Sequence, residues 1–174
     1  MPRMSTASRT VPMSNTGEPF SRRRPRTRPP RPRRPDMAEA QRPQVAIVTG
    51  ASSGIGRACA LAMDAAGMRL VIVGRSRERL EALAPFLSHE PVVVAGDVAD
   101  PATTAQAVGR ALESFGWLDI LLANAGLYLP DRGWEVAPER VTEIVTTNVL
   151  GVMHGVHAAL PTLIAQGAGD IVVT

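Results

Sequence analysis

The sequence predicts an α/β protein in which a doubly wound parallel sheet lies between two layers of helices. Along residues 44–174, short apolar segments rich in β-branched residues alternate with longer segments that have helical periodicity. The short segments contain few polar positions, which is typical of parallel strands covered on both faces. Single helices between successive strands form parallel βαβ units with right-handed crossovers, so a three-layer αβα arrangement is expected.

Five segments have the length and composition of buried strands: residues 44–48, 69–73, 92–95, 118–123 and 170–174. The first is followed by Thr49 and Gly50, where the chain can turn sharply out of the sheet. The fifth begins at Asp170 and runs to the end of the sequence. We therefore expect an incomplete domain over residues 37–174, with its sheet truncated within the fifth strand.

Four segments between the strands are predicted helices: residues 54–66, 76–87, 101–115 and 138–166. Gly67 is the expected C-cap of the first helix, because glycine tolerates the left-handed conformation needed there. Ser76 is the expected N-cap of the second helix and Asp100 that of the third. The last helix is expected to have a break near Asn148 or Gly151 and a bend at Pro161.

Apolar residues on two of the predicted helices are expected to be buried, either against the sheet or against a second subunit. On the first helix, the expected inward residues are Ile55, Cys59, Leu61 and Met63. On the last helix, a stripe suited either to packing on the sheet or to a contact between two subunits consists of Met153, Val156 and Leu160.

Residues 1–36 differ in composition from the rest of the chain. They contain ten arginine and eight proline residues against two acidic residues, a net charge of +8, whereas residues 37–174 carry a net charge of −5. Because proline lacks the N–H that helices and sheets need, and because like charges repel, we expect a disordered tail upstream of the true start at Met37. An arm that binds nucleic acid is compatible with the charge but is the less favoured interpretation. The tail lacks the apolar segment of a secretory signal, and its prolines exclude an amphipathic transit helix.

Composition argues against several classes of protein. The single cysteine, Cys59, cannot form an intramolecular disulfide, so a cytoplasmic protein is expected. His154 and His157 lie three residues apart but have no third ligand near them in sequence, so no metal site is expected. Unbroken apolar runs fall far short of the roughly 20 residues of a membrane span, so no membrane contact is expected. The sequence has no lysine, and Tyr128 is its only tyrosine.

A glycine-rich turn follows the first predicted strand and is the strongest motif in the sequence. Gly50 lets the chain turn, Gly54 allows a pyrophosphate to approach the backbone, and Gly56 allows the helix to pack closely on the strand. The phosphates would meet free N–H groups at the positive end of the helix dipole. Ser52 and Ser53 add hydroxyl donors. Because this turn joins a strand to a helix within a βαβ unit, it predicts a dinucleotide-binding site.

The motif TGASSGIG, residues 49–56, resembles the cofactor fingerprint of the short-chain dehydrogenase/reductase family, whose members have a Rossmann fold. Further matches follow in register: the pair Asp97-Val98, the triplet Asn124-Ala125-Gly126, and Asn148 in TTNVLG. The resemblance implies that Asp97 contacts adenine, that the triplet steadies the sheet beside the cofactor, and that Asn148 belongs to the catalytic site. It implies cofactor binding by Gly50, Ser52, Ser53, Gly54, Ile55, Gly56, Asp97, Val98, Asn124, Ala125 and Gly126.

The sequence departs from the family pattern where the chemistry is expected. In the family the fifth strand runs into an active-site serine, and a Tyr-x-x-x-Lys motif follows, whereas this sequence ends at Thr174. Tyr128 and Arg132 have the same spacing, but Pro130 and Gly133 predict a loop there, so we reject them as a catalytic pair. The resemblance therefore implies the cofactor-binding part of an oxidoreductase, and the chain as given is expected to be inactive.

Charge after the second strand predicts the cofactor. Sites specific for NAD place an acidic residue about 20 residues past the glycines. Arg75 occupies this region here, and its guanidinium would bind a 2′-phosphate that an acid would repel. Ser53 argues the other way, since many NADP-dependent relatives have a basic residue at that position. NADP is therefore expected in preference to NAD.

Two functions are compatible with these features. The favoured one is an NADP-dependent oxidoreductase of an alcohol or carbonyl substrate, whose full-length form is a dimer or tetramer. Segments such as LDILLANAGLY resemble ribitol-type polyol dehydrogenases. The alternative is a non-catalytic dinucleotide-binding module with a basic tail.

Overall fold

One parallel sheet organises the part of the chain that the structure describes, residues 42–128 and 135–174. In this computed structural model its strands are β1 (Val45–Thr49), β2 (Arg69–Gly74), β3 (Val92–Ala95), β4 (Ile120–Ala123) and β5 (Asp170–Val173). Their order is β3-β2-β1-β4-β5, and all neighbouring strands are parallel. The predicted doubly wound sheet is confirmed. The predicted tail and the start at Met37 lie outside the described residues.

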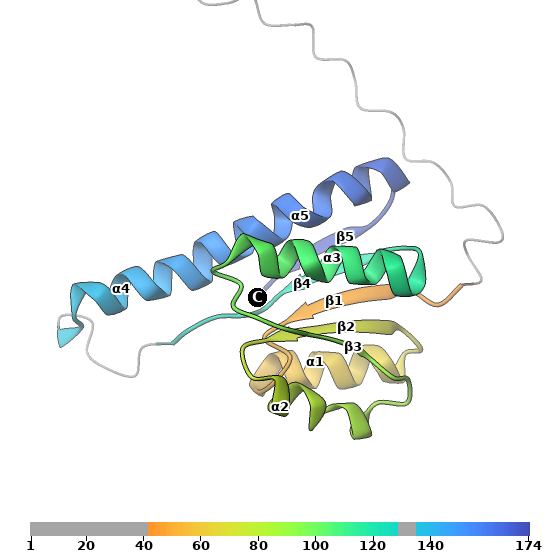
Figure 1. The fold of residues 1–174 in the computed structure, drawn as a ribbon, viewed down its shortest axis with the longest axis horizontal. Coiled ribbons are helices and arrows are strands. Elements are labelled where there is room, and N and C mark those ends of the chain that lie inside the picture. Colours follow the sequence, from red (N-terminus) through yellow and green to blue (C-terminus); the bar gives the residue numbers. More distant parts are fainter. Residues whose placement is uncertain (1–41, 129–134) are drawn as a thin grey trace, which may run out of the picture. The chain divides into compact units, whose positions relative to one another are not determined.

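Helices cover both faces of the sheet (Figure 1). They are α1 (Gly54–Ala65), α2 (Arg77–Glu81), the 3₁₀ turn η2 (Ala84–Phe86), α3 (Pro101–Phe115), α4 (Pro138–Val145), the π-helical segment η4 (Thr146–Leu150) and α5 (Gly151–Gln166). α3 and α5 lie on one face, and α1 and α2 on the other. Alternate residues of β1 supply the two halves of the core, because successive strand side chains point to opposite faces. Val45 and Ile47 belong to one half, and Ala46 and Val48 to the other.

The order of connections leaves a crevice at the carboxyl ends of the strands. The chain passes from β1 outward to β2 and β3, and then returns to the other side of β1 to form β4 and β5. The connections that leave β1 and β4 therefore run to opposite sides of the sheet. In open α/β sheets, ligands bind at this switch point, outside the carboxyl ends of the two strands.

The helix after Ser76 is shorter than predicted. The Ser76 hydroxyl accepts a hydrogen bond from the backbone N–H of Arg79 at 3.3 Å, which confirms the predicted cap. However, α2 ends at Glu81 and does not reach Leu87. Pro85 accounts for the difference, because it has no N–H and its ring would collide with the carbonyl group four residues earlier.

The buried face of α1 differs from the predicted one. Ile55 is 67% exposed, while the buried residues are Gly56, Ala60 and Asp64. These lie four residues apart, and small side chains at the first two allow the helix to approach the sheet closely. The remaining predicted residues are partly buried: Cys59, Leu61 and Met63.

The last predicted helix continues through a π-helical segment. The predicted break near Asn148 is present as η4, where the N–H of Gly151 bonds to the carbonyl of Thr146. Pro161 lies within α5. Residues of α5 that face the core are Gly151, Gly155, Ala159 and Leu163. Packing on the sheet is therefore the wrong interpretation for two members of the predicted apolar stripe, since Met153 is 58% and Leu160 41% exposed.

The helical run Pro138–Gln166 meets the length and composition criteria of a membrane span. It has 29 residues, and its most apolar window has a mean hydropathy of 1.3, with 22% of that window buried. The prediction that no span exists considered only unbroken apolar runs, and the structure joins several of them into one helix. One such helix is weak evidence, because a helix packed on the core of a soluble protein meets the same criteria.

A polar cluster fixes the amino end of β1. The Arg42 guanidinium donates to both carboxylate oxygens of Asp119 at 2.7 Å and lies 4.4 Å from the centre of the Trp117 ring. Asp119 also accepts the backbone N–H of Val45 at 2.8 Å and the indole N–H of Trp117 at 3.1 Å. The cluster thus ties the entry of β1 to the start of β4, and its paired geometry makes it stronger than a single surface ion pair.

Asp64 links the end of α1 to the segment before β3. Its buried carboxylate accepts the backbone N–H of Ser88 at 2.6 Å and that of His89 at 3.1 Å, and contacts the His89 ring at 3.0 Å. Burial is the largest single influence and acts to raise the pKa of Asp64. The hydrogen bonds from Ser88 and His89 together outweigh it and hold that pKa below its ordinary value.

Replacing Asp64 by asparagine should lower the free energy of unfolding by about 1–3 kcal/mol near neutral pH, because an amide cannot accept all three bonds. A lowered pKa in the folded state means that the carboxylate stabilises the fold above its ordinary pKa of about 4. That contribution disappears as the pH falls through the lowered folded pKa. Urea unfolding across this range should therefore show a smaller acid dependence in Asp64→Asn than in the parent. Glu90→Gln, at an exposed carboxylate nearby, is the control and should behave as the parent does.

Candidate functional site

The turn between β1 and α1 can form only with glycine at three positions. Gly50 and Gly54 have φ angles of +69° and +52°, a region that other residues rarely adopt. A Cβ on Gly56 would lie 2.3 Å from the carbonyl oxygen of Gly50 and 2.5 Å from Nδ2 of Asn124. The first turn of α1 is thereby pressed against the end of the sheet.

Thr49 and Asn124 join the carboxyl ends of β1 and β4. The Thr49 hydroxyl accepts the backbone N–H groups of Asn124 and Ala125, both at 3.0 Å, and donates to the carbonyl of Leu122 at 3.4 Å. The Asn124 amide donates to the carbonyl of Thr49 at 3.0 Å, and its oxygen accepts the Thr174 hydroxyl at 3.1 Å. Asn124 therefore reaches across the junction from which the glycine turn leaves the sheet.

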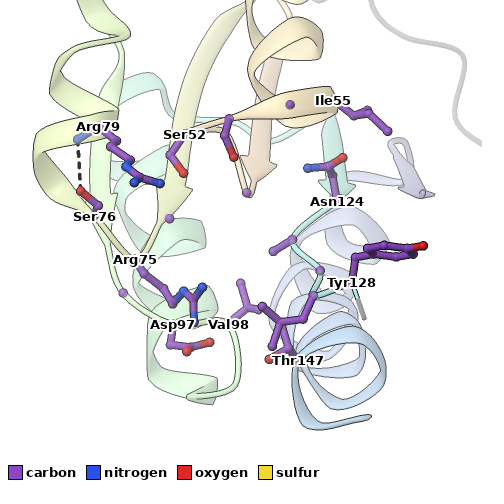
Figure 2. A pocket seen from close by; sticks show the side chains of 18 residues that line it. Ser52, Ile55, Arg75, Ser76, Arg79, Asp97, Val98, Asn124, Tyr128 and Thr147 are labelled. Atoms are coloured by element: carbon purple, nitrogen blue, oxygen red, sulfur yellow. Dashed lines mark hydrogen bonds between the residues drawn. The ribbon is translucent and has the colours of Figure 1, made fainter. Parts of the chain in front are cut away.

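A pocket of about 630 Å³ opens at this junction (Figure 2). Ser52 lies above it, Asp97, Val98 and Thr147 lie opposite, and the two remaining sides carry different chemistry. Arg75, Ser76 and Arg79 lie on one side, and Ile55, Asn124 and Tyr128 lie on the other. Eleven of the predicted site residues line it: Gly50, Ser52, Ser53, Gly54, Ile55, Arg75, Asp97, Val98, Asn124, Ala125 and Gly126.

Two predicted site residues do not line the pocket. Gly56 instead allows the close approach of α1 to Gly50 and Asn124. The Asn148 side chain accepts the backbone N–H of Leu127 at 2.7 Å and donates to the carbonyl of the same residue at 2.9 Å. Asn148 thus holds the segment that leaves β4, and its catalytic role stays a prediction.

Seven lining residues were not predicted from the sequence: Gly74, Ser76, Arg79, Gly96, Leu127, Tyr128 and Thr147. Arg79 had a usable signal, because it lies in the first turn of the helix that Ser76 caps, directly after Arg75 and the second strand. Tyr128, rejected as half of a catalytic pair with Arg132, is 84% exposed. Arg132 lies outside the described residues. Nothing in the sequence indicated that Thr147 lines the pocket, because its position depends on the π-helical segment η4.

The electrostatics of the pocket favour an anion at the glycine turn. The Ser53 side chain makes no capping hydrogen bond at the start of α1. N–H groups of the first helical turn have no partner within the helix and carry the positive end of its dipole. Arg75 and Arg79 are exposed at the neighbouring edge. Among residues 42–128 and 135–174, no group of three or more histidine, cysteine or acidic side chains has the arrangement of a metal site.

Comparison with known proteins identifies this architecture. A family model described as short chain dehydrogenase matches residues 44–174. The chain belongs to this family. Dehydrogenase/reductase SDR family member 7B of Bos taurus is 36% identical over 137 residues, which represent 74% of this chain and 42% of that protein.

Two solved structures have a similar fold. A short-chain dehydrogenase/reductase of Burkholderia phymatum in complex with NAD has a TM-score of 0.71 and 33% identity, over 75% of this chain and 48% of that chain. L-Sorbose reductase of Gluconobacter frateurii, complexed with NADPH and L-sorbose, has a TM-score of 0.69 and 32% identity, over 75% and 51% of the two chains. The chain spans about half the length of the curated relatives that it matches.

Adding one methyl group at Gly56 tests the packing under the pocket. Gly56→Ala should lower the free energy of unfolding by about 1–3 kcal/mol, because the new Cβ has only backbone and amide atoms to displace. Gly109→Ala in the middle of α3 is the matched control, since nothing lies within 4 Å of its Cβ. That control should stabilise the protein by about 0.5–1 kcal/mol in the same denaturant titration. A Gly56→Ala protein as stable as the parent would contradict the close approach of α1.

Proposed function

We propose that the pocket binds a nicotinamide dinucleotide and that the chain provides the cofactor-binding part of an oxidoreductase of alcohol or carbonyl substrates. The observation that carries this proposal is the glycine turn, which opens the first turn of a helix onto a pocket at the switch point of the sheet. The backbone at Gly54 has nothing within 4 Å of a Cβ position, so a phosphate can approach it closely. The bound nicotinamide would carry the hydride in this chemistry.

The lining residues divide the pocket into three parts that suit the parts of a dinucleotide. Backbone N–H groups at Ser53 and Gly54 suit the pyrophosphate. Asp97 and Val98 suit the adenine, because a carboxylate accepts its amino group and an apolar side chain packs on its ring. Gly126 and Tyr128, on the far side of the turn, suit the nicotinamide.

Charge at the ribose end supports NADP as the preferred cofactor. Arg75 and Arg79 both line the pocket beside Ser76, and the one acidic side chain among the described lining residues is Asp97, drawn next to Arg75 (Figure 2). The 2′-phosphate of NADP would accept charge-assisted hydrogen bonds from these arginines. The 2′-hydroxyl of NAD carries no charge, so with NAD the guanidinium groups would remain hydrated. The solved relatives described above hold NADPH in one case and NAD in the other, so the preference rests on these arginines.

Reversal of charge at Arg75 tests this preference. The parent should bind NADP more tightly than NAD, and Arg75→Asp should reverse that order, because one charge-assisted bond is worth about 1.5–3 kcal/mol, or tenfold and upward in affinity. Calorimetry with both nucleotides measures the two affinities. Arg77→Asp is the matched control, since Arg77 is exposed, pairs with Glu81 and does not line the pocket. Equal affinity of the parent for the two nucleotides would remove the role of Arg75.

The exposed face of the long helix supports assembly into a homo-oligomer. Apolar residues exposed along α4, η4 and α5 are Val141, Val145, Val149, Leu150, Met153, Leu160 and Ile164. Two copies of the chain would cover this surface if their helices paired.

For the substrate we propose an alcohol or ketone of the polyol class, on the sequence resemblance and on the likeness to the reductase solved with L-sorbose. A cytoplasmic location agrees with the single free cysteine.

Binding and turnover should separate in the 174-residue chain. It contains no lysine, and its only tyrosine, Tyr128, is exposed in the segment after β4. No side chain is therefore available to act as an acid–base tyrosine whose pKa a lysine lowers. We expect nucleotide binding without oxidation of NADPH in the presence of carbonyl substrates, as followed by its absorbance. Steady-state turnover above background would contradict this, and the DNA sequence after codon 174 would show whether Ser and Tyr-x-x-x-Lys codons follow.

A further inference from the structure

His154 connects α5 to the edge of the pocket. Its Nδ1 lies 3.1 Å from the carbonyl oxygen of Val98, a residue 56 positions earlier in the chain. A carbonyl oxygen can only accept, so the hydrogen of this bond is on Nδ1. Val98 itself lines the pocket and is only 5% exposed. His154 does not line the pocket and reaches it only through Val98.

The same helix also fixes the side chain of Val98. A Cβ on Gly151 would lie 2.7 Å from Cγ2 of Val98, so the glycine leaves a recess that the valine fills. Gly151 precedes His154 by three residues and lies on the same face of α5. One turn of helix therefore holds Val98 by both its side chain and its carbonyl group.

The neighbouring Asp97 depends on the same contact. Its carboxylate accepts the N–H of Ala99 at 2.9 Å, and its carbonyl accepts the N–H of Asp100 at 3.0 Å. These bonds shape a tight turn from within, but they do not attach it to the rest of the fold. On the amino side the N–H of Gly96 attaches the turn to the carbonyl of Gly74 at 3.0 Å. On the carboxyl side the hydrogen bond from His154 to Val98 attaches it to α5, so this bond helps to set where the Asp97 carboxylate lies in the pocket (Figure 2).

We propose that His154 is a positioning residue for recognition of the nucleotide base. This inference rests on the proposed function, in which Asp97 accepts the amino group of adenine. Guanine presents a carbonyl oxygen at the corresponding ring position, so a well-placed carboxylate favours adenine over guanine. Loss of the His154 bond removes the polar attachment of Val98 to α5, which loosens the position of the Asp97 carboxylate and weakens that discrimination.

The test compares ADP and GDP binding to the 174-residue chain by calorimetry. In His154→Leu, ADP affinity should fall by about five- to tenfold, the value of one hydrogen bond, and the ratio of ADP to GDP affinity should shrink by a similar factor. His154→Asn should restore most of both, because its Nδ2 is the same number of bonds from the backbone as Nδ1 of histidine. His157→Leu, exposed one turn later on α5, is the matched control and should leave both affinities unchanged.

Several outcomes would overturn the proposal. Unchanged ADP affinity and base selectivity in His154→Leu would remove the role of His154 while leaving the proposed function intact. If ADP affinity fell equally in His154→Leu and His154→Asn while the ratio of ADP to GDP affinity stayed unchanged, His154 would contribute only packing, and its role in base recognition would be excluded. If the parent bound neither ADP nor NADP, the proposed function itself would fail.

A measurement on the parent keeps the inference testable if the leucine variant does not fold. Nitrogen-15 NMR of the imidazole should show the His154 tautomer with its hydrogen on Nδ1. Predominance of the hydrogen on Nε2 would exclude a donated bond to Val98 and would overturn the proposal.

Discussion

The junction between the carboxyl ends of β1 and β4 is the constraint on which the rest of the site depends. The chain segments that follow these two neighbouring parallel strands diverge there, because the connection from β1 and the connection from β4 run to opposite sides of the sheet. Thr49 and Asn124 hold the strand ends together by hydrogen bonds, and Gly50 and Gly56 allow α1 to begin almost in contact with them. An anion can approach free backbone N–H groups only because this packing leaves no side chain in the way.

The sequence contained the information for this junction but not for the contacts that surround it. Glycine spacing, strand composition and helix caps are local signals, so the turn at Gly50, the Ser76 cap and a doubly wound parallel sheet were predictable. Ile55 was misplaced because apolar character alone predicts burial, whereas the small size of Gly56 and Ala60 decides which face of α1 packs. The contact between His154 and Val98 joins residues 56 positions apart and depends on the π-helical segment, which no local pattern specifies.

The two faces of α5 differ in composition. Glycine and alanine on the inner face bring the helix close to the sheet and to Val98, while Met153, Leu160 and other apolar residues face outward. A subunit that packed on the outer face would therefore press on the helix that supports the pocket wall. Assembly and nucleotide binding would then share a single rigid element.

The polar cluster at the other end of the sheet has a practical consequence. Arg42 precedes β1 by three residues, and through Asp119 and Trp117 it fastens the entry of β1 to β4. A shortened protein that begins at Met37 retains this fastening, whereas one that begins at the strand itself loses a bidentate pair and leaves the Asp119 carboxylate with fewer donors. Removal of Arg42 would therefore loosen the start of β1, at the end of the sheet opposite the pocket.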